Sequence, residues 1–345
     1  MNFLTAGSLA AAVFTVAVLL TRRFCNPISI VYVLDHPNER SLHELAVPRG
    51  GGLAILLAVF AGGLGLTWFC GDTSLAGLAV GAILVGSVSF LDDRYSVPPF
   101  YRLLIHIVAV AVILYQGYVL KNLTIPGVIL DWPFGVAVLF SLLFCVWLIN
   151  LYNFMDGMDG LAGGMAVFGF GIFAMLGWLA DHEPFSVTSL IVGSASAGFL
   201  IFNFPPARIF MGDVGSSTLG FLVAAFSLWG ARDGIFPFWI ALLVFSPFIA
   251  DATVTLLRRI LRGERFWQAH KTHYYQRLVQ AGWGHRKTVL LEYAIMLGCG
   301  ITTLVVVRAP VGMQAAAFAS WMLFYFLFFS WVSRHAARHD KEKIT

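Results

Sequence analysis

Long apolar segments separated by short polar loops dominate this chain. Each segment is close to the length that crosses a bilayer as a helix, about 20 residues. The eleven predicted segments are 3–20, 51–69, 75–91, 102–119, 133–150, 161–180, 186–202, 214–230, 235–257, 288–307 and 312–333. The first ends at Arg22-Arg23 without a small-residue cleavage site, so we expect a retained span rather than a signal peptide. The pattern predicts an all-α, polytopic membrane helical bundle in a single domain, 1–345.

The basic residues predict how this bundle is oriented. If the N-terminus is periplasmic, the outer loops hold only Lys121, Arg232 and Arg308, and 19 of the 22 Lys and Arg fall on the inner side or at its boundary. The positive-inside rule favours this arrangement, with a cytoplasmic C-terminus. The inner loops are then 22–50, 92–101, 151–160, 203–213 and 258–287.

Composition agrees with a membrane protein and excludes other classes. Hydrophobic residues make up 59% of the chain, against about 45–50% in an ordinary soluble domain, and the mean hydropathy is +0.82. The net charge of +4 does not indicate nucleic-acid binding, because the basic residues lie in loops between apolar segments. The four cysteines are far apart, so they predict neither a disulfide framework nor a metal site.

Three acidic motifs interrupt or end apolar segments, although the chain has only 18 Asp and Glu. They are FLDDR (90–94), NLYNFMDGMDGLAGG (150–164) and FMGDVGSS (210–217). An ionised carboxylate within a membrane costs roughly 2.5–3.5 kcal/mol even on lenient scales, which makes it a functional candidate. In the predicted topology all three motifs lie on the inner face. We therefore expect one cytoplasmic site for a divalent metal and a phosphorylated substrate.

The first and third motifs provide candidate metal ligands. The adjacent carboxylates Asp92 and Asp93 suit a base or a metal ligand, although a charged stop at the membrane surface is the alternative reading. Asp213 stands before a Gly-Ser turn at a predicted helix start, where backbone amides can receive an anion. Mg²⁺ prefers one or two carboxylates together with substrate phosphates. We therefore expect Asp213 to bind the metal, with Asp92 and Asp156 as further candidates.

The middle motif is the most specific of the three. Asp156 and Asp159 share a face of a helix or tight turn, and a glycine follows each. Asn150 and Asn153 lie on that face and can donate to phosphate or sugar oxygens. Helix packing would explain the glycines, but it would not explain two carboxylates and two amides at this spacing.

Two basic loops supply the opposite charge. They carry Arg40, His43 and Arg49 in 36–54, and His270, His273 and Arg277 in 270–278. Facing three acidic motifs, these residues suit the binding of a diphosphate better than a surface role. A zinc site with two histidines is poorly supported, and the protease pattern HExxH fails because Val47 stands in the place of its second histidine.

Taken together and in this order, the motifs FLDD, NxxNxxDGxDGLAGG, NFPPARIFMGDVGS and the late histidine loop resemble the polyprenyl-phosphate N-acetylhexosamine-1-phosphate transferases. The likeness runs from about Asp35 to Arg286. It implies transfer from a UDP-N-acetyl amino sugar to undecaprenyl phosphate, with release of UMP and a requirement for Mg²⁺, or Mn²⁺ in its place. It also implies a location in the bacterial inner membrane, and it leaves a homodimer open.

The resemblance also implies roles for individual residues. The residue matching Asp213 binds the metal, and that matching Phe210 stacks on uracil. Asp92 and Asp93 match a pair that binds metal or the lipid phosphate, and Asp156 matches a residue at the reacting centre. The implied substrate-binding residues are Asn150, Asn153, Asp159, Asn203, Arg208, Phe210, Arg40, His43, Arg49, His270 and Arg277. A covalent aspartyl intermediate is an alternative, but direct attack by the lipid phosphate is favoured.

One departure from the family pattern concerns the late loop. Many relatives carry HxHH, whereas here His273 is followed by Tyr275 and Gln276 in the places of the other two histidines. This form resembles the O-antigen branch that uses 6-deoxy amino sugars, so the resemblance does not fix the sugar as GlcNAc. We expect His273 to keep a catalytic role, with His270 able to compensate for the missing histidines.

Two other classes of membrane protein also carry intramembrane charge. A lipid-linked sugar flippase would place its polar groups near the membrane midplane, whereas the motifs here are predicted on one face. An intramembrane aspartyl protease could use Met211-Gly212-Asp213, but it would need neither Asn150 nor Asn153. Release of UMP from a UDP-sugar separates these classes.

Overall fold

The structure of the protein is a computed structural model that describes residues 3–29, 31–35, 37, 42, 46–70, 75–264 and 270–342. Its long helices are α1 (Phe3–Phe24), α2 (Gly51–Cys70), α3 (Ala76–Tyr95), α4 (Pro99–Tyr115), α5 (Phe134–Met155), α6 (Leu161–Leu179), α7 (Glu183–Asn203), α8 (Gly212–Arg232), α10 (Ser246–Leu261), α12 (Gly284–Val306) and α13 (Val311–Glu342). The shorter helical segments are α9 (Phe238–Val244), α11 (Tyr274–Leu278) and the π-helical turn Val279–Trp283.

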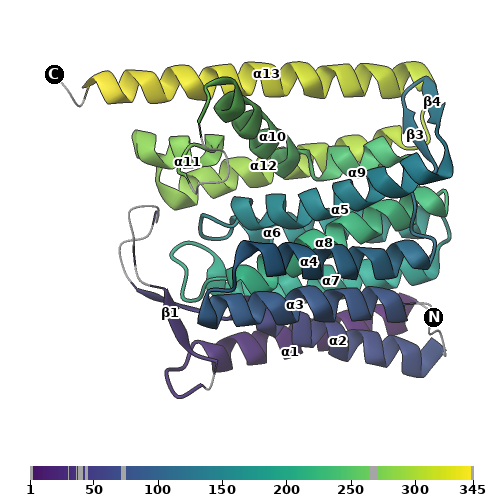
Figure 1. Cartoon of the computed structure of the whole chain (residues 1–345), viewed down its shortest axis with the longest axis horizontal. Helices are drawn as coiled ribbons and strands as arrows, with labels where there is room; N and C mark the ends of the chain where they lie inside the picture. Colours follow the sequence, from purple (N-terminus) through teal and green to yellow (C-terminus); the bar gives the residue numbers. More distant parts are fainter. Residues whose placement is uncertain are drawn as a thin grey trace.

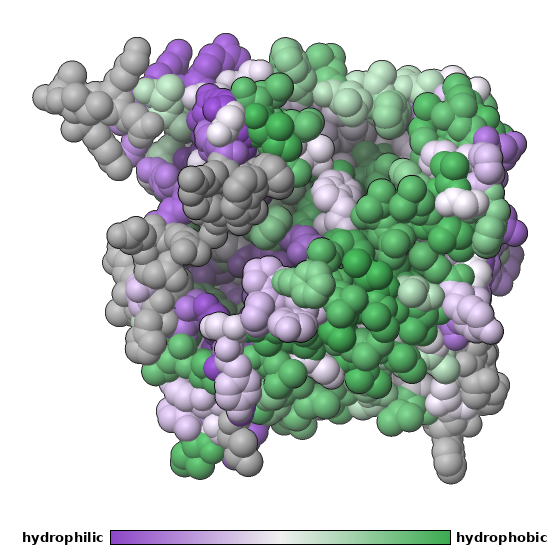
Figure 2. All heavy atoms as spheres, in the orientation of Figure 1, coloured by the Kyte–Doolittle hydropathy of each residue, from purple (hydrophilic) through white to green (hydrophobic). Residues whose placement is uncertain are grey.

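These helices lie side by side in one bundle, with α1 and α2 along one edge and α13 along the other (Figure 1). Within the described residues, eight helices are long and apolar enough to cross a membrane, and the bent pair α9–α10 makes a ninth. Hydrophobic side chains cover the middle of the visible face, and hydrophilic ones gather toward its two ends (Figure 2). The prediction of an all-α, multi-pass membrane bundle is therefore confirmed.

Every predicted segment falls on one of these helices or on the bent pair. One of them, α4, is a shorter apolar helix, and the same holds for the part of α2 that ends at Thr67, so the count of eleven spans stays a prediction. The segment 235–257 is not the single straight helix that we predicted, because α9 and α10 meet at an angle of 84°. Pro247 lies in the first turn of α10. A proline there lacks the amide hydrogen that would continue the preceding helix.

Helix α8 is the centre of the bundle. In its most apolar stretch 94% of the residues are buried, whereas in that of α13 only 17% are buried. Small residues bring the neighbouring helices close: a Cβ on Gly220 would lie 2.7 Å from the carbonyl oxygen of Leu148 on α5, and one on Gly81 of α3 would lie 2.2 Å from the Phe221 ring. The start of α8, which carries Asp213, is therefore held by packing along the whole helix.

Two small antiparallel hairpins lie at opposite ends of the bundle (Figure 1). They are β1 (Val33–Asp35) with β2 (Val47–Arg49), and β3 (Asn122–Ile125) with β4 (Val128–Asp131). The start of α1 lies at the end of the bundle that holds β3 and β4, and the last turns of α13 reach the end that holds β1. This placement agrees with termini on opposite sides of a membrane.

The predicted orientation can be tested by cysteine labelling. In a background without the four native cysteines, we expect a cysteine at the exposed Ser96 to react with an impermeant maleimide only from the cytoplasmic side. A cysteine at the exposed Asn122, on β3, should react only from outside. The reverse result in intact cells would show that the bundle is inverted.

Candidate active site

The first and third acidic motifs meet at the start of α8. The Asp93 carboxylate accepts hydrogen bonds from the backbone amides of Asp213 and Val214, both at 3.3 Å. Gly212 has φ +71°, and a Cβ there would lie 2.9 Å from Asp93 Oδ2. Amides in the first turn of a helix have no partner within the helix, and the helix dipole favours a negative charge there. Asp93 therefore caps α8 and fixes the position of Asp213.

A residue that we did not predict, Arg102 on α4, joins the two remaining carboxylates of these motifs. Its Nη1 contacts Asp92 Oδ2 and lies 3.3 Å from Asp213 Oδ2. One guanidinium nitrogen therefore touches both side chains, which shows that Asp92 and Asp213 converge. In the sequence, Arg102 is only the first residue of an apolar segment, where a basic side chain is ordinary.

Arg49 brings the β1–β2 hairpin to the same place. Its Nη2 donates to Asp35 at 2.7 Å, and its Nη1 lies 3.8 Å from Asp93 Oδ1. The backbone of Phe210 joins this hairpin, because its amide donates to the carbonyl of Pro48 at 2.8 Å. The structure thus places Arg49 and Phe210 beside the acidic residues, whereas Arg40 and His43 lie outside the described residues.

The middle motif packs against the same end of α8. Asn153 donates to the Ser217 hydroxyl at 3.2 Å, while the Asn150 amide bonds the carbonyl of Val146 in its own helix. Asp156 follows the last turn of α5. Burial raises the pKa of Asp156 to about 8, and the charges of Asp213 and Asp93 add to this effect. Such a carboxyl group gains from the arrival of a cation.

Asp159 and Asn203 hold the second and third motifs together. Asp159 accepts from the amide of Ala207 at 3.0 Å and lies 3.2 Å from His285 Nδ1. Asn203 accepts from the amide of Gly160 and donates to the carbonyl of Ile209, both at 2.9 Å. The structure gives both residues scaffolding partners, and their contact with substrate stays a prediction. His285 was missed because a lone histidine at a helix start carries no signal.

The late histidine loop packs against the middle motif. A side chain at Gly157 would lie 2.3 Å from the Tyr275 hydroxyl and 3.2 Å from Gln276 Nε2. His273 caps α11, and its amide donates to Gln276 Oε1 at 3.2 Å. The two residues in the places of the family's histidines therefore lie beside the acidic turn. The predicted convergence of the motifs on one site is confirmed by these contacts.

Three predicted basic residues have less direct positions. Burial, together with the charges of His273 and Arg259, lowers the pKa of His270 to about 4. His270 is therefore neutral near pH 7 in the absence of substrate, and its contact with a diphosphate stays a prediction. Arg277 donates to Ser333 on α13 at 3.0 Å, and Arg208 is exposed. A contact of Arg208 or Arg277 with substrate stays a prediction.

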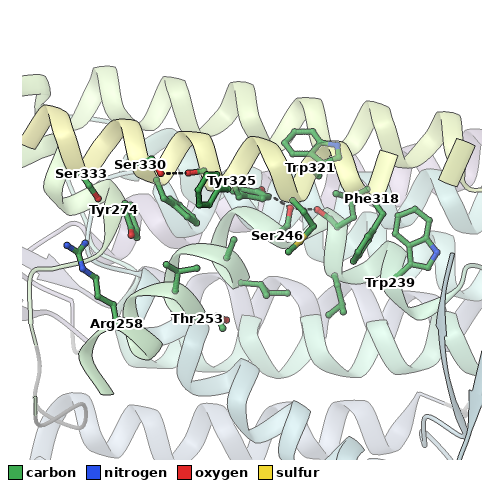
Figure 3. Close-up of a pocket in the computed structure, with 18 of the residues that line it drawn as sticks. Trp239, Ser246, Thr253, Arg258, Tyr274, Phe318, Trp321, Tyr325, Ser330 and Ser333 are labelled. Atoms are coloured by element: carbon green, nitrogen blue, oxygen red, sulfur yellow. Dashed lines mark hydrogen bonds between the residues drawn. The ribbon is translucent and has the colours of Figure 1, made fainter. Parts of the chain in front are cut away.

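An apolar groove of about 890 Å³ lies between the bent pair α9–α10 and α13 (Figure 3). Trp239 and Phe318 lie at one end, and Arg258 and Tyr274 lie at the other. Arg334 also lines the groove. Because Tyr274 directly follows His273, the charged end of the groove adjoins the late histidine loop.

The arrangement of carboxylates bears on the predicted metal ligands. Within the described ranges, no three His, Cys, Asp or Glu side chains are gathered as a ready set of metal ligands. The predicted trio of Asp92, Asp156 and Asp213 is therefore not assembled in this structure. Asp92 and Asp213, which share Arg102, form a pair, and such a pair fits an ion that takes one or two carboxylates and completes its shell with substrate phosphates.

Several known proteins are similar to this chain over most of its length. The model of glycosyl transferase family 4 matches residues 75–231. The Bacillus subtilis protein named "Probable undecaprenyl-phosphate N-acetylglucosaminyl 1-phosphate transferase" is 32% identical over 281 residues, 81% of this chain and 78% of that protein. A decaprenyl-phosphate N-acetylglucosaminephosphotransferase of Mycobacterium leprae is 32% identical over 298 residues, 75% of this chain and 73% of that protein.

A third relative extends the comparison to another sugar. A phospho-N-acetylmuramoyl-pentapeptide-transferase of Halalkalibacterium halodurans is 29% identical over 270 residues, 72% of this chain and 80% of that protein. The names of the first two relatives specify N-acetylglucosamine with different polyprenyl phosphates, and that of the third specifies a phospho-N-acetylmuramoyl-pentapeptide. Together with the multi-pass bundle and the converging acidic motifs, these matches show that the chain belongs to glycosyl transferase family 4, within the polyprenyl-phosphate hexosamine-1-phosphate transferase superfamily.

Proposed function

We propose that this protein transfers a sugar-1-phosphate from a UDP-N-acetyl amino sugar to undecaprenyl phosphate. The products are UMP and a lipid-diphosphate sugar. The observation that carries this proposal is the meeting of Asp92, Asp213 and Arg102 at the start of the central helix. A diphosphate and a lipid phosphate need both signs of charge there, since a metal must be held and phosphate oxygens must be neutralised.

The chain's residues fit a magnesium ion. Asp92 and Asp213 would hold it, with Asp156 near enough to feel the charge of Asp213. When bound, Mg²⁺, or Mn²⁺ in its place, neutralises the charge that develops as the bridging oxygen leaves with UMP. The raised pKa of Asp156 supports this assignment, because a cation relieves the repulsion among carboxylates that burial makes costly.

The reaction needs positioning more than covalent help. We propose that an oxygen of the lipid phosphate attacks the sugar-bearing phosphorus of the UDP-sugar. A new P–O bond forms as the P–O bond to UMP breaks, and the bridging electron pair leaves with UMP. A phosphate monoester carries roughly −1.5 to −2 charges at pH 7, so it can act as the nucleophile without a strong base. Arg102 and Arg49 reduce the repulsion between the two anions, and Phe210 offers its ring to uracil.

The apolar groove supports a polyprenyl chain as the acceptor's tail. Its walls are apolar over most of their length, and Arg258 lies at the end where a phosphate would follow the chain toward the site (Figure 3). Burying such a chain is favourable at about 25 cal/mol per Å² of apolar surface. We propose that the protein resides in the bacterial inner membrane and that its product initiates O-antigen or another cell-envelope polysaccharide.

The proposed function is tested by the release of UMP from purified protein with undecaprenyl phosphate and a panel of UDP-amino sugars. We expect UMP and a lipid-linked sugar to form in equal amounts with at least one donor, in Mg²⁺ but not in excess EDTA. UDP-GlcNAc and a 6-deoxy analogue together decide the branch. Full turnover in EDTA would contradict the metal assignment, and no UMP from any donor would contradict the proposed reaction.

The raised pKa of Asp156 predicts how the metal requirement changes with pH. Below about pH 8 the Asp156 carboxyl group is protonated without metal, and a cation held nearby by Asp92 and Asp213 would favour its ionised form, so metal binding is coupled to the loss of this proton. We expect the Mg²⁺ concentration that gives half-maximal turnover to rise up to roughly ten-fold per pH unit from pH 8 down to pH 6. Titrations of Mg²⁺ at fixed saturating substrates measure it. A half-maximal Mg²⁺ concentration that stays constant over this range would show that metal binding is not coupled to the ionisation of Asp156.

A further inference from the structure

Asp251, a carboxylate on α10 that our sequence analysis did not single out, is buried in the protein interior. Its side chain is only 4% exposed. Oδ1 accepts from the backbone amide of Tyr274 at 3.0 Å and from the Thr255 hydroxyl at 3.0 Å, and Oδ2 accepts from the amide of Tyr275 at 3.1 Å. A buried carboxylate is costly unless it has such donors. Asp251 therefore anchors the first turn of α11.

The same carboxylate holds the side chain of His273. Nδ1 of the ring lies 3.1 Å from Asp251 Oδ1, and the histidine is also 4% exposed. An ionised carboxylate can only accept hydrogen bonds, so Nδ1 must carry the hydrogen. This contact fixes both the orientation of the ring and its tautomer, and it leaves Nε2 to interact with another group.

The residues that Asp251 anchors are the ones that contact the acidic turn. The backbone amide of Tyr275 donates to Asp251, and the Tyr275 hydroxyl lies beside Gly157, where an added Cβ would lie 2.3 Å from it. Gln276 bonds the amide of His273 and lies on the same side of that glycine. A shift of Asp251 would therefore move residues 273–276 relative to the turn that carries Asp156.

Asp251 also lies next to the apolar groove. Its neighbours Ile249, Ala250 and Thr253 line the groove, as does Tyr274, whose amide it binds (Figure 3). The bent helix α10 thus presents one face to the groove and, through Asp251, holds the histidine loop with another. No other described carboxylate bonds both the side chain of His273 and the backbone of α11.

We infer that Asp251 is a positioning residue for the transfer reaction. It holds His273 with Nδ1 occupied and Nε2 directed elsewhere, and it keeps residues 273–276 against the turn that carries Asp156. The catalytic consequence of this inference rests on the proposed function, whereas the hydrogen bond between Asp251 and His273 is independent of it.

The kinetic test compares Asp251→Asn, His273→Asn and the double variant in the full-length protein. Loss of a charged partner for a buried hydrogen bond lowers kcat by roughly ten- to a hundred-fold if it is felt in the transition state. We expect that loss for Asp251→Asn, with little change in the KM for the UDP-sugar. If Asp251 acts through His273, the double variant should be no slower than His273→Asn alone. Losses that multiply in the double variant, or a wild-type kcat in Asp251→Asn, would overturn the inference.

A matched control is available at the other end of α8. Asp233 also bonds a histidine, since its Oδ2 lies 3.2 Å from His182 Nε2, but it is remote from the acidic motifs. Asp233→Asn should keep the wild-type kcat. An equal loss in both variants would show that Asp251 has only the general effect of any Asp–His pair on stability, and it would count against a positioning role.

A spectroscopic test separates this inference from the proposed function, because it does not require turnover. We expect ¹⁵N NMR of histidine-labelled wild-type protein to show an Nδ1–H ring signal that is missing in folded His273→Asn and is therefore assigned to His273. An Nε2–H tautomer for His273 would overturn the inference even if UMP is released. If UMP is not released but the Nδ1–H signal is present, the proposed function fails while the assigned geometry stands.

Discussion

Asp213→Asn is expected to abolish sugar-phosphate transfer while leaving the protein folded. The amide keeps the shape of the side chain, and the backbone amide of residue 213 can still donate to Asp93. The substitution removes one of the two charges that converge on Arg102 and that would hold the metal. Loss of a metal ligand removes several kcal/mol of charge stabilisation, and about 4 kcal/mol corresponds to roughly a thousand-fold in rate.

Initial rates of UMP release at several Mg²⁺ concentrations measure this effect, and thermal unfolding checks the fold. Asp131→Asn is a suitable control, because Asp131 is an exposed aspartate on β4 at the opposite end of the bundle. We expect the control to keep wild-type turnover and both variants to unfold at the wild-type temperature. If Asp213→Asn turns over at a rate near that of Asp131→Asn, Asp213 is not the essential ligand.

The sequence alone predicted that the acidic motifs lie together, because most of the candidate site residues belong to short, recognisable motifs. Carboxylates that end apolar segments are costly enough to stand out, and the parity of the predicted spans places them on one face. The contacts between Asp93 and Asp213, and between Gly157 and Tyr275, bring these motifs together in the structure, while their cytoplasmic placement stays a prediction. Local patterns were sufficient here, because each motif lies in or beside a loop at the end of an apolar segment.

Residues that act through a partner distant in the sequence could not be found in this way. Arg102 and Asp251 are single charges within or beside apolar segments, and nothing in the sequence states that they face Asp92 or His273. The break between α9 and α10 was missed for a similar reason. A proline near the middle of an apolar segment permits either a continuous kinked helix or two helices joined at a sharp bend, and the structure shows two helices that meet at 84°.

The glycines after Arg49 allow the start of α2 to pack closely against the start of α8. Gly51 and Gly52 begin α2, and the amide of Gly52 donates to the carbonyl of Met211 at 2.8 Å. A Cβ on Gly52 would lie 2.1 Å from the backbone nitrogen of Gly215 on α8. Two helix starts therefore touch through their backbones, directly beside Asp213.

Gly52→Ala is consequently expected to reduce turnover at least about a hundred-fold. The new methyl group must push the start of α8 away by more than the contact allows, and a displacement of about 1 Å at a reacting centre can cost a hundred-fold in rate. Overpacking at such a contact also costs roughly 1–3 kcal/mol of unfolding free energy.

Gly63→Ala is the control on the same helix. No atom lies within 4 Å of the carbon that it adds, and alanine is a better helix former than glycine by about 1 kcal/mol. Thermal unfolding should therefore show Gly52→Ala to be less stable than the wild type and Gly63→Ala to be more stable. Measured turnover should fall only in Gly52→Ala. Equal turnover in the two variants would show that the start of α8 can move without disturbing Asp213.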